Sequence, residues 1–391
     1  MLDASRPAVT VTARGEQRLR EGHVWIYRSD VTDPKAMAGD LVSVVSPKGR
    51  VLGDALYSDR STIAVRMLTR GDLPADTAWW RARLESAIAY RNSLHIDATA
   101  FRLVHGEGDQ LPSLVVDRYG DYLVVQALSQ GIDRRLPELC GMLVERLSPM
   151  GVLARNDAQV RRLEGLERRV DVLFGSVPET VTVREGDVQY EVDPWKGQKT
   201  GLFLDQRENR EAARQYARGR LLDCFSYTGG FALRLAARAD EVVAIDASAD
   251  AIATLSRNAQ RNGFTHIRAQ VGNAFDVLRE LERRGERFDT IVLDPPAFAK
   301  NRAAVAKARP GYKEINLRAL KLLVPGGYLV TCSCSYHISE AAFGEIVYAA
   351  VSDARATVVL VDKRMQGRDH PVLLGVPETY YLKCFILRKL I

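Results

Sequence analysis

The sequence has 391 residues, which exceeds one ordinary domain and predicts two or three domains. Hydrophobic residues make up 46% and charged residues 27%, so folded cores are expected, and the formal net charge of +6 mildly favours a polyanionic partner. The chain shows no run of about 18 apolar residues, no secretory pattern over Met1–Arg20, and no disulfide or zinc spacing among its five cysteines, so we expect a cytoplasmic protein without a bound metal.

Residues 1–75 are predicted to form a small β-rich domain. Turn signals such as Pro47–Gly49 separate short runs rich in β-branched residues, and a polar helix is expected over Gly15–Gly22. The β-rich runs begin at Val9, Leu41, Val51 and Ile63. With Gly22-His-Val-Trp-Ile-Tyr and the later Ala38-Gly-Asp, the arrangement resembles a PUA domain, which implies a compact pseudo-barrel that binds structured RNA.

Residues 76–180 are predicted to form a middle α+β domain. A helix is expected over Thr77–Ser93, a hairpin turn at Tyr119-Gly-Asp, and an amphipathic helix over Leu136–Leu147, followed by a strand from Gly151. No catalytic constellation is visible in this part of the sequence.

Residues 181–391 alternate between strands and helices after a lead-in hairpin at 181–193. Strands are predicted at 220–226, 241–247, 266–272, 288–294 and 327–334, with a final pair at 357–362 and 380–388. This alternation is typical of an α/β protein with a parallel, doubly wound sheet, and the final pair predicts an antiparallel strand at one edge.

Polar and glycine-rich segments follow four of these predicted strands. Open α/β sheets bind ligands beyond the carboxyl ends of their strands, so we expect a cofactor there. The expected contact residues are Asp223, Phe225, Ser226, Tyr227, Thr228, Gly229, Gly230, Asp246, Ala247, Ser248, Asn273, Ala274, Phe275, Asp294 and Pro295. Each carboxylate taken alone could be a simple helix cap. Helix capping does not explain why such segments follow several successive strands at the same edge of the sheet.

The charge of this predicted site indicates which cofactor it binds. Asp223 stands at the glycine loop, where its carboxylate would repel the pyrophosphate of a dinucleotide. The amino group and sulfonium of S-adenosylmethionine are cationic and would be attracted. Asp246 could accept both ribose hydroxyls, and Asn273 with Phe275 suits the edge and face of adenine. A nicotinamide oxidoreductase is the disfavoured alternative.

Several long motifs in one order resemble the PUA-containing class I 23S rRNA cytosine-C5 methyltransferases. They are Gly197–Arg210, Cys224–Phe231, Leu293–Lys300, Ser333–Ser335, Asp369–Leu373 and Pro377–Lys383. The resemblance implies S-adenosylmethionine-dependent methylation of a cytosine in large-subunit rRNA before the mature ribosome has formed. It also implies cofactor contacts from Phe203, Asp205 and Gln206. A homodimer is an open alternative to a monomer.

For such a methyltransferase the catalytic residues are expected to be Cys334 and Asp294. A thiolate that adds to carbon 6 of cytosine gives carbon 5 the electron density to attack a methyl group, and Asp294 would hold ring nitrogen 3. Cys332 and Cys334 are two residues apart and are expected on the same strand face. Many RNA cytosine-C5 methyltransferases have a further cysteine where this chain has Ala297, so the group that assists thiolate release is open.

Basic and aromatic residues indicate where RNA could bind. The segment after Asp294 is rich in lysine and arginine and would flank the reactive site. The expected RNA contacts are Lys300, Arg302, Lys307, Arg309 and Lys313, with Trp25 and Tyr27 as candidates for base stacking. A solvated helix face and packing inside the barrel are the alternatives. An RNA nitrogen methyltransferase (guanine N7 or an exocyclic amine) and a non-catalytic ribosome assembly factor also stay open.

Overall fold

The computed structural model describes residues 6–299 and 301–391, and they divide into two compact units. The first unit comprises the chain up to Val183 together with Val192–Gly201 and Arg368–Thr379. The second comprises Arg184–Glu191, Leu202–Gly367 and Tyr380–Ile391. The chain therefore passes between the units five times, after Val183, Glu191, Gly201, Gly367 and Thr379. The division at residues 75 and 180 into three domains stays a prediction.

A six-stranded sheet with one helix forms the start of the first unit, in the order β2-β6-β5-β4-β1-β3. Helix α1 begins two residues earlier than expected, because the Thr12 hydroxyl accepts a hydrogen bond from the Gly15 N–H at 3.1 Å and caps the helix there. The elements are β1 (Ala8–Val11), α1 (Ala13–Arg20), β2 (Trp25–Tyr27), β3 (Val31–Pro34), β4 (Leu41–Val45), β5 (Val51–Tyr57) and β6 (Ile63–Met67), with a short 3-10 helix at Arg28–Asp30.

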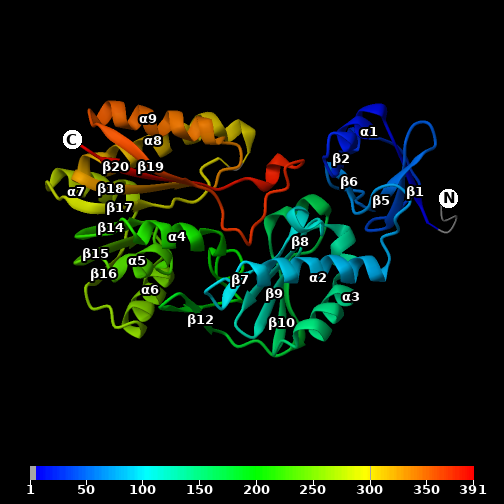
Figure 1. The fold of residues 1–391 in the computed structure, drawn as a ribbon, viewed down its shortest axis with the longest axis horizontal. Coiled ribbons are helices and arrows are strands. Elements are labelled where there is room, and N and C mark those ends of the chain that lie inside the picture. Colours follow the sequence, from blue (N-terminus) through cyan, green and yellow to red (C-terminus); the bar gives the residue numbers. More distant parts are fainter. Residues whose placement is uncertain (1–5, 300) are drawn as a thin grey trace. The chain divides into compact units, whose positions relative to one another are not determined.

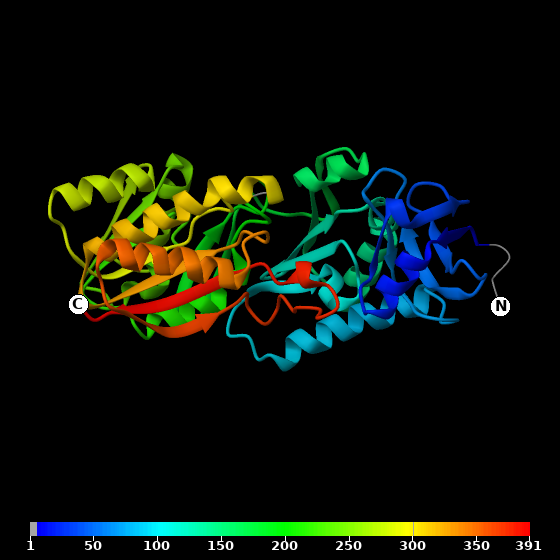
Figure 2. The same cartoon turned by 90° about the horizontal axis from the view of Figure 1, so that it is seen from above.

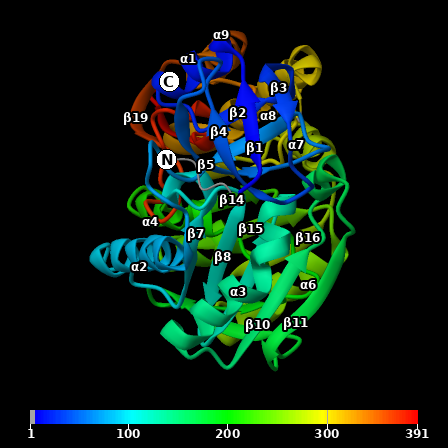
Figure 3. The ribbon, with the colours of Figure 1, turned by 90° about the vertical axis from the view of Figure 1, so that its right-hand side faces the viewer.

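A five-stranded sheet in the order β11-β10-β9-β8-β7 follows, and helix α3 lies against it (Figure 3). Helix α3 begins six residues before the predicted start, since Pro137, which often marks a first turn, lies inside it. The elements are α2 (Thr77–Ser93), β7 (Ala100–His105), β8 (Leu114–Tyr119), β9 (Tyr122–Ala127), α3 (Gln130–Leu147), β10 (Gly151–Asn156) and β11 (Arg169–Gly175), with 3-10 helices at Gly106–Asp109 and Gln159–Glu164. A hairpin of β12 (Val181–Glu185) and β13 (Val188–Val192) comes next.

The second unit is built on a seven-stranded sheet in the order β16-β15-β14-β17-β18-β20-β19. Helices α4–α6 cover one face and α7–α9 the other (Figure 1), and each face has its own apolar core. The elements are α4 (Arg207–Arg214), β14 (Arg220–Cys224), α5 (Gly230–Ala236), β15 (Glu241–Asp246), α6 (Ala249–Arg261), β16 (Ile267–Val271), α7 (Ala274–Arg283), β17 (Phe288–Leu293), α8 (Val305–Leu322), β18 (Leu323–Ser333), α9 (Glu340–Ala354), β19 (Val358–Arg364) and β20 (Lys383–Lys389), with 3-10 helices at Leu204–Gln206, Arg302–Ala304 and Pro377–Thr379. This arrangement confirms the predicted doubly wound α/β fold.

The antiparallel strand is not at the edge, which corrects one expectation. Strand β20 runs antiparallel between β18 and β19, and β19 takes the edge position (Figure 2). The apolar content of the two strands explains the order. Five consecutive residues of β20 from Lys383 are buried, whereas most of β19 is exposed, and a strand buried on both faces belongs inside a sheet.

Within the described residues, no helix has the length and apolar character needed to cross a membrane.

Candidate functional site

Four polar residues stand where adjacent strands of the second unit end. Asp223 is the penultimate residue of β14 and Asp246 the last of β15, while Asp294 and Cys334 directly follow β17 and β18. The parallel register pairs β14 with both β15 and β17, and β17 with β18. Their carboxyl ends therefore meet at one edge of the sheet, where ligands bind in folds of this type.

The loop after β14 has an unusual backbone. Phe225 and Tyr227 have φ values of 64° and 48°, and Gly229 has 95°, so three alternate residues occupy the left-handed region. Residues other than glycine rarely adopt this conformation, which costs about 1–3 kcal/mol each. The Ser226 N–H donates to the Ile245 carbonyl at 3.0 Å and ties the loop to β15. Strain held in this way is typical of a ligand-binding loop.

Asp223 has the chemistry expected of a partner for a cationic ligand. Its side chain is buried, and one oxygen, Oδ2, accepts from the Ala232 N–H at 2.9 Å. The other oxygen, Oδ1, is buried without a hydrogen-bond donor from the described residues. Burial raises the pKa of Asp223 well above its usual value, and the charges of Asp294 and Asp246 raise it further. A bound ammonium group would supply both the missing donor and the compensating charge.

Asp246 is held in place by the backbone on both sides. Its Oδ2 accepts from the Tyr227 N–H and its Oδ1 from the Ser248 N–H, each at 2.9 Å. The side chain is half-buried, so its remaining lone pairs can accept from the hydroxyls of a ribose. Ser248 caps α6 through a bond from the Ala251 N–H at 3.2 Å.

Aromatic side chains gather beside these carboxylates. The Phe275 ring lies 6.5 Å from the Phe225 ring and 5.9 Å from the Phe298 ring, centre to centre. Asn273 is exposed and caps α7 by accepting from the Phe275 N–H at 2.9 Å. The three rings offer an apolar surface suited to a flat base such as adenine. Phe298 was not among the predicted cofactor residues.

Two residues of the segment before α4 contact different parts of the second unit. The Phe203 ring packs edge-on against the Tyr227 ring at 5.4 Å. Asp205 is buried and accepts from the Tyr381 hydroxyl at 2.8 Å. The other predicted cofactor residues lie in the loops already described. Thr228, Ala274 and Pro295 are buried, Gly230 is half-buried, and Ala247 is exposed.

A chain of hydrogen bonds that the sequence did not reveal leads to Asp294. The Gln206 amide nitrogen donates to Asp294 Oδ1 at 2.8 Å. Asn209 in turn donates to the Gln206 amide oxygen at 2.6 Å, and Arg364 donates to the Asn209 oxygen at 3.2 Å. Since each donor fixes the next amide, Asp294 is oriented by groups from α4 and β19. Gln206 therefore contacts a predicted catalytic residue directly.

Cys334 is the cysteine best placed for chemistry. It is half-buried, whereas Cys140, Cys224, Cys332 and Cys384 are buried. Its sulfur lies 3.9 Å from the carbonyl oxygen of Pro295, the residue that follows Asp294. Cys334 also lies one residue beyond the end of β18, and its placement on the same strand face as Cys332 stays a prediction. Cys332 pairs with Cys384 across the strands, and burial raises its pKa well above the usual thiol value.

The residues predicted to contact RNA differ in whether they form ion pairs with acidic side chains. Lys300 lies outside the described residues. Arg302 and Lys307 are exposed and form no ion pair with the described residues. Arg309 pairs with Glu345 at 3.0 Å and Lys313 with Asp353 at 2.7 Å, so acidic residues of α9 offset part of the positive charge that the local sequence suggested. The RNA role of this segment stays a prediction.

The two aromatic residues proposed to stack bases are engaged within the first unit. The Trp25 indole N–H donates to Glu107 at 2.9 Å, and its ring meets the His23 ring edge-on. The Arg18 guanidinium lies 4.4 Å from the centre of the Tyr27 ring. Both rings are half-buried, which favours packing within the domain over free base-stacking surfaces.

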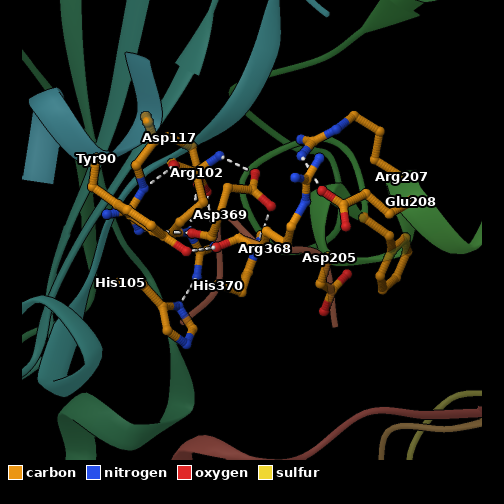
Figure 4. Close-up of polar contacts among 12 residues, drawn as sticks. Tyr90, Arg102, His105, Asp117, Asp205, Arg207, Glu208, Arg368, Asp369 and His370 are labelled. Carbon is orange, nitrogen blue, oxygen red and sulfur yellow. Dashed lines mark hydrogen bonds and ion pairs between the residues drawn. The ribbon is translucent and has the colours of Figure 1, made fainter. Parts of the chain in front are cut away.

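The family motif at Asp369 belongs to a buried polar cluster of the first unit (Figure 4). Asp369 accepts from the Arg102 N–H through Oδ2 at 2.9 Å, and its carbonyl accepts from Arg91 at 2.7 Å. The Tyr90 hydroxyl donates to the Arg368 carbonyl at 3.0 Å, and His370 lies 3.0 Å from Asp369 Oδ1. These contacts attach residues 368–379 to α2 and β7, which indicates a structural role for the motif.

Comparison with known proteins agrees with the fold. A family profile described as a PUA-like domain matches residues 9–70, and one described as an S-adenosylmethionine-dependent methyltransferase matches residues 102–363. A putative methyltransferase solved with S-adenosylhomocysteine superposes with a TM-score of 0.85 at 20% identity, covering 97% of this chain and 99% of that one. A putative methyltransferase from Streptococcus mutans gives 0.83 at 20% identity, with the same coverage.

The fold and these two family matches thus define an S-adenosylmethionine-dependent methyltransferase with an amino-terminal PUA-like domain. Similar curated proteins bear the name ribosomal RNA large subunit methyltransferase I. The protein from Tolumonas auensis is 39% identical over 96% of this chain and 97% of its own length, and that from Vibrio cholerae is 37% identical over 98% and 100%. The chain belongs to this family, which confirms the resemblance found in its sequence.

Proposed function

We propose that this protein transfers a methyl group from S-adenosylmethionine to carbon 5 of a cytosine in large-subunit ribosomal RNA. The names of its relatives support ribosomal RNA as the substrate. The position of Cys334 carries the choice of cytosine. A half-buried thiol next to the Asp294–Pro295 turn lies where a base presented to the cofactor site would meet both a nucleophile and a carboxyl group.

The cofactor is assigned to the loops at the carboxyl ends of β14, β15 and β16. Asp223 would hold the amino group of S-adenosylmethionine through its unpaired buried oxygen, and Asp246 the ribose hydroxyls. Phe225, Phe275 and Phe298 would contact the adenine. When bound, the cofactor supplies an electrophilic methyl group on a sulfonium. Three nearby carboxylates favour such a cation over an anionic dinucleotide.

The chain's own residues account for the activation of cytosine. The Cys334 thiolate forms a bond to carbon 6 of the ring, which breaks the aromatic system and leaves carbon 5 electron-rich. Asp294, fixed by Gln206, would donate a hydrogen bond from its carboxylic acid form to ring nitrogen 3 as electron density develops there. After carbon 5 is methylated, a base takes its proton, the electron pair of the C–H bond restores the ring double bond, and the bond to Cys334 breaks. The thiolate is regenerated.

The variant Cys334→Ala tests the covalent route. We expect its turnover to fall at least about 1,000-fold, because removal of a nucleophile abolishes the step that it starts. Methyl transfer to ribosomal RNA would be followed with labelled S-adenosylmethionine, and the product nucleoside would be identified by mass spectrometry. Cys140→Ala, which changes a buried thiol of the first unit, is the matched control and should keep normal turnover.

One feature favours a second candidate, an RNA nitrogen methyltransferase. The sequence Asp294-Pro-Pro-Ala-Phe is similar to the Asp-Pro-Pro-aromatic motif of enzymes that methylate amino groups. Such an enzyme needs no thiol, so Cys334→Ala would retain turnover and the product would be a methylated guanine or an N-methylated base. That result would replace the cytosine assignment while leaving the cofactor assignment intact.

A further inference from the structure

Lys383 is a buried lysine next to the proposed nucleophile. It is the first residue of β20, and 1% of its surface is exposed. Its Nζ donates to the Ser335 carbonyl at 2.7 Å and to the Tyr381 carbonyl at 2.9 Å. No carboxylate of the described residues forms an ion pair with it. An ammonium group in such a place is costly and is seldom found without a role.

The strand register places Lys383 alongside Cys334. Lys383 pairs with Ser333 in the β18–β20 ladder and bonds the carbonyl of Ser335, so it contacts the residues on both sides of the cysteine. Its bond to the Ser335 carbonyl ties the turn that carries the thiol to the start of β20. The turn that carries the half-buried cysteine is therefore bonded to a buried cation.

Few charged groups surround Lys383 and Cys334. Burial lowers the pKa of Lys383 to about 8, while the negative charges of Cys334 and Glu340 act in the opposite direction. Glu340 of α9 also pairs with Lys363, at 2.6 Å. The Tyr312 hydroxyl of α8 faces Cys334 as well, and burial followed by the Cys334 charge raises the pKa of that phenol. Lys363 is taken up by its ion pair with Glu340, whereas Lys383 bonds only carbonyls in the described residues, and most of it is protonated at neutral pH.

We propose that Lys383 is a positioning residue for Cys334, holding its turn through the Ser335 carbonyl and stabilising the thiolate with its positive charge. This inference rests on the proposed covalent function. The thiol proton passes to solvent, which reaches the half-buried sulfur, and Lys383 keeps its own proton. The same charge favours the thiolate again when it leaves carbon 6. It thus supplies assistance to release in a chain that has Ala297 where related enzymes have a second cysteine.

The pH dependence of Cys334 alkylation tests the proposal without any methyl transfer. Iodoacetamide would be applied to the full-length protein across a range of pH, and modification of Cys334 would be measured by peptide mass spectrometry. Lys383→Met should raise the pH midpoint of Cys334 alkylation by about one pH unit, which makes alkylation at pH 7 about tenfold slower. Lys383→Arg should keep the midpoint near that of the native chain.

Lys389→Met is the matched control. Lys389 lies at the other end of β20 and also donates to two carbonyls, those of Leu320 and Leu323, at 3.0 Å and 2.9 Å. The Lys389→Met variant should leave the pH midpoint of Cys334 alkylation unchanged. An unchanged midpoint in a folded Lys383→Met protein would overturn the proposal. Lys383→Gln is measured in parallel, and if neither uncharged variant folds, the lysine is structural and the proposal fails.

These outcomes are separate from those that test the proposed function. If Cys334→Ala keeps turnover while Lys383→Met shifts the alkylation midpoint, the cysteine is not the nucleophile, yet the electrostatic pairing is real. If Cys334→Ala loses turnover and the midpoint does not move, the covalent route stands and the role of Lys383 is withdrawn.

Discussion

At the scale of single residues, Asp223 shows how a binding site lowers stability. Its carboxylate is buried with one oxygen unpaired by the described residues, and burial raises its pKa well above the usual value. Because the folded protein holds the proton more tightly than the unfolded chain, the contribution of Asp223 to stability is fully present below about pH 4. It is lost as the pH rises through the raised pKa of the folded state.

The variant Asp223→Asn should therefore stabilise the protein without cofactor. The amide oxygen keeps the bond from the Ala232 N–H but carries no charge, so we expect a gain of about 1–3 kcal/mol at pH 7 that vanishes near pH 4. Thermal melts at the two pH values measure it. Binding of S-adenosylmethionine, measured by calorimetry, should weaken at least about tenfold, or about 1.4 kcal/mol.

Asp240→Asn serves as the control for that experiment. Asp240 is exposed in the turn before β15, at the opposite end of the strand from the proposed site. Its removal should change neither the melting temperature nor cofactor affinity appreciably. If Asp223→Asn binds the cofactor as well as the native chain does, the assignment of Asp223 to the amino group is wrong.

At the scale of elements, the loop between β14 and α5 depends on Gly229. Its φ of +95° strains any other residue, and an added Cβ would lie 2.8 Å from Leu233 and 2.9 Å from Leu255. We expect Gly229→Ala to destabilise the protein by about 2–4 kcal/mol, combining the left-handed backbone with overpacking. Cofactor affinity should fall as well. Melting with and without S-adenosylmethionine measures both effects.

Gly263 provides the comparison for that loop. It also has a positive φ, +71°, but an added Cβ would meet nothing within 4 Å. Gly263→Ala should cost only the backbone term, about 1–2 kcal/mol, and should leave cofactor binding unchanged. Equal losses in the two variants would show that crowding around Gly229 is unimportant.

The elements also show what the sequence could and could not predict. Strands β14, β15 and β17, which carry Asp223, Asp246 and Asp294 at or next to their ends, were predictable because buried parallel strands are continuous apolar runs followed by polar turns. The order of β19 and β20 was not, since it depends on which strand is more completely buried. Pairings between distant segments, such as Arg364 with Asn209 or Arg309 with Glu345, leave no local pattern.

Lys383 illustrates the same limit. In the sequence it is a lysine at the start of an apolar run, which is typical of an exposed strand end. Only the pairing of β20 with β18 shows that it is buried beside Cys334. The choice of Cys334 over Cys332 stays a prediction, supported by the half-buried position of Cys334 and the burial of Cys332.

At the scale of the whole molecule, the chain returns late to complete the first unit. Residues 368–379 belong to that unit, and Asp369 accepts hydrogen bonds from Arg91 and from the Arg102 backbone. Asp369→Ala should leave the buried Arg102 N–H without its partner and destabilise the first unit by about 1–3 kcal/mol. Amide hydrogen exchange should accelerate in β7 and α2.

The second unit is the internal control for that variant. Exchange in β14 and β15 should match the native chain, because Asp369 contributes nothing to their sheet. Uniformly faster amide exchange in both units would contradict the conclusion that residues 368–379 stabilise the first unit alone. Unchanged exchange in β7 would show that the Asp369 bonds contribute no net stability.

The late return of the chain has a consequence for biosynthesis. A ribosome that has made residue 180 must still add the chain up to Asp369, which takes roughly 10–40 s at ordinary rates of translation. During that interval the nascent first unit contains Arg91 and Arg102 but lacks Asp369, which accepts their hydrogen bonds. Its final packing therefore waits until residues 368–379 have been made, and chaperones that hold emerging chains would meet the first unit in an incomplete state.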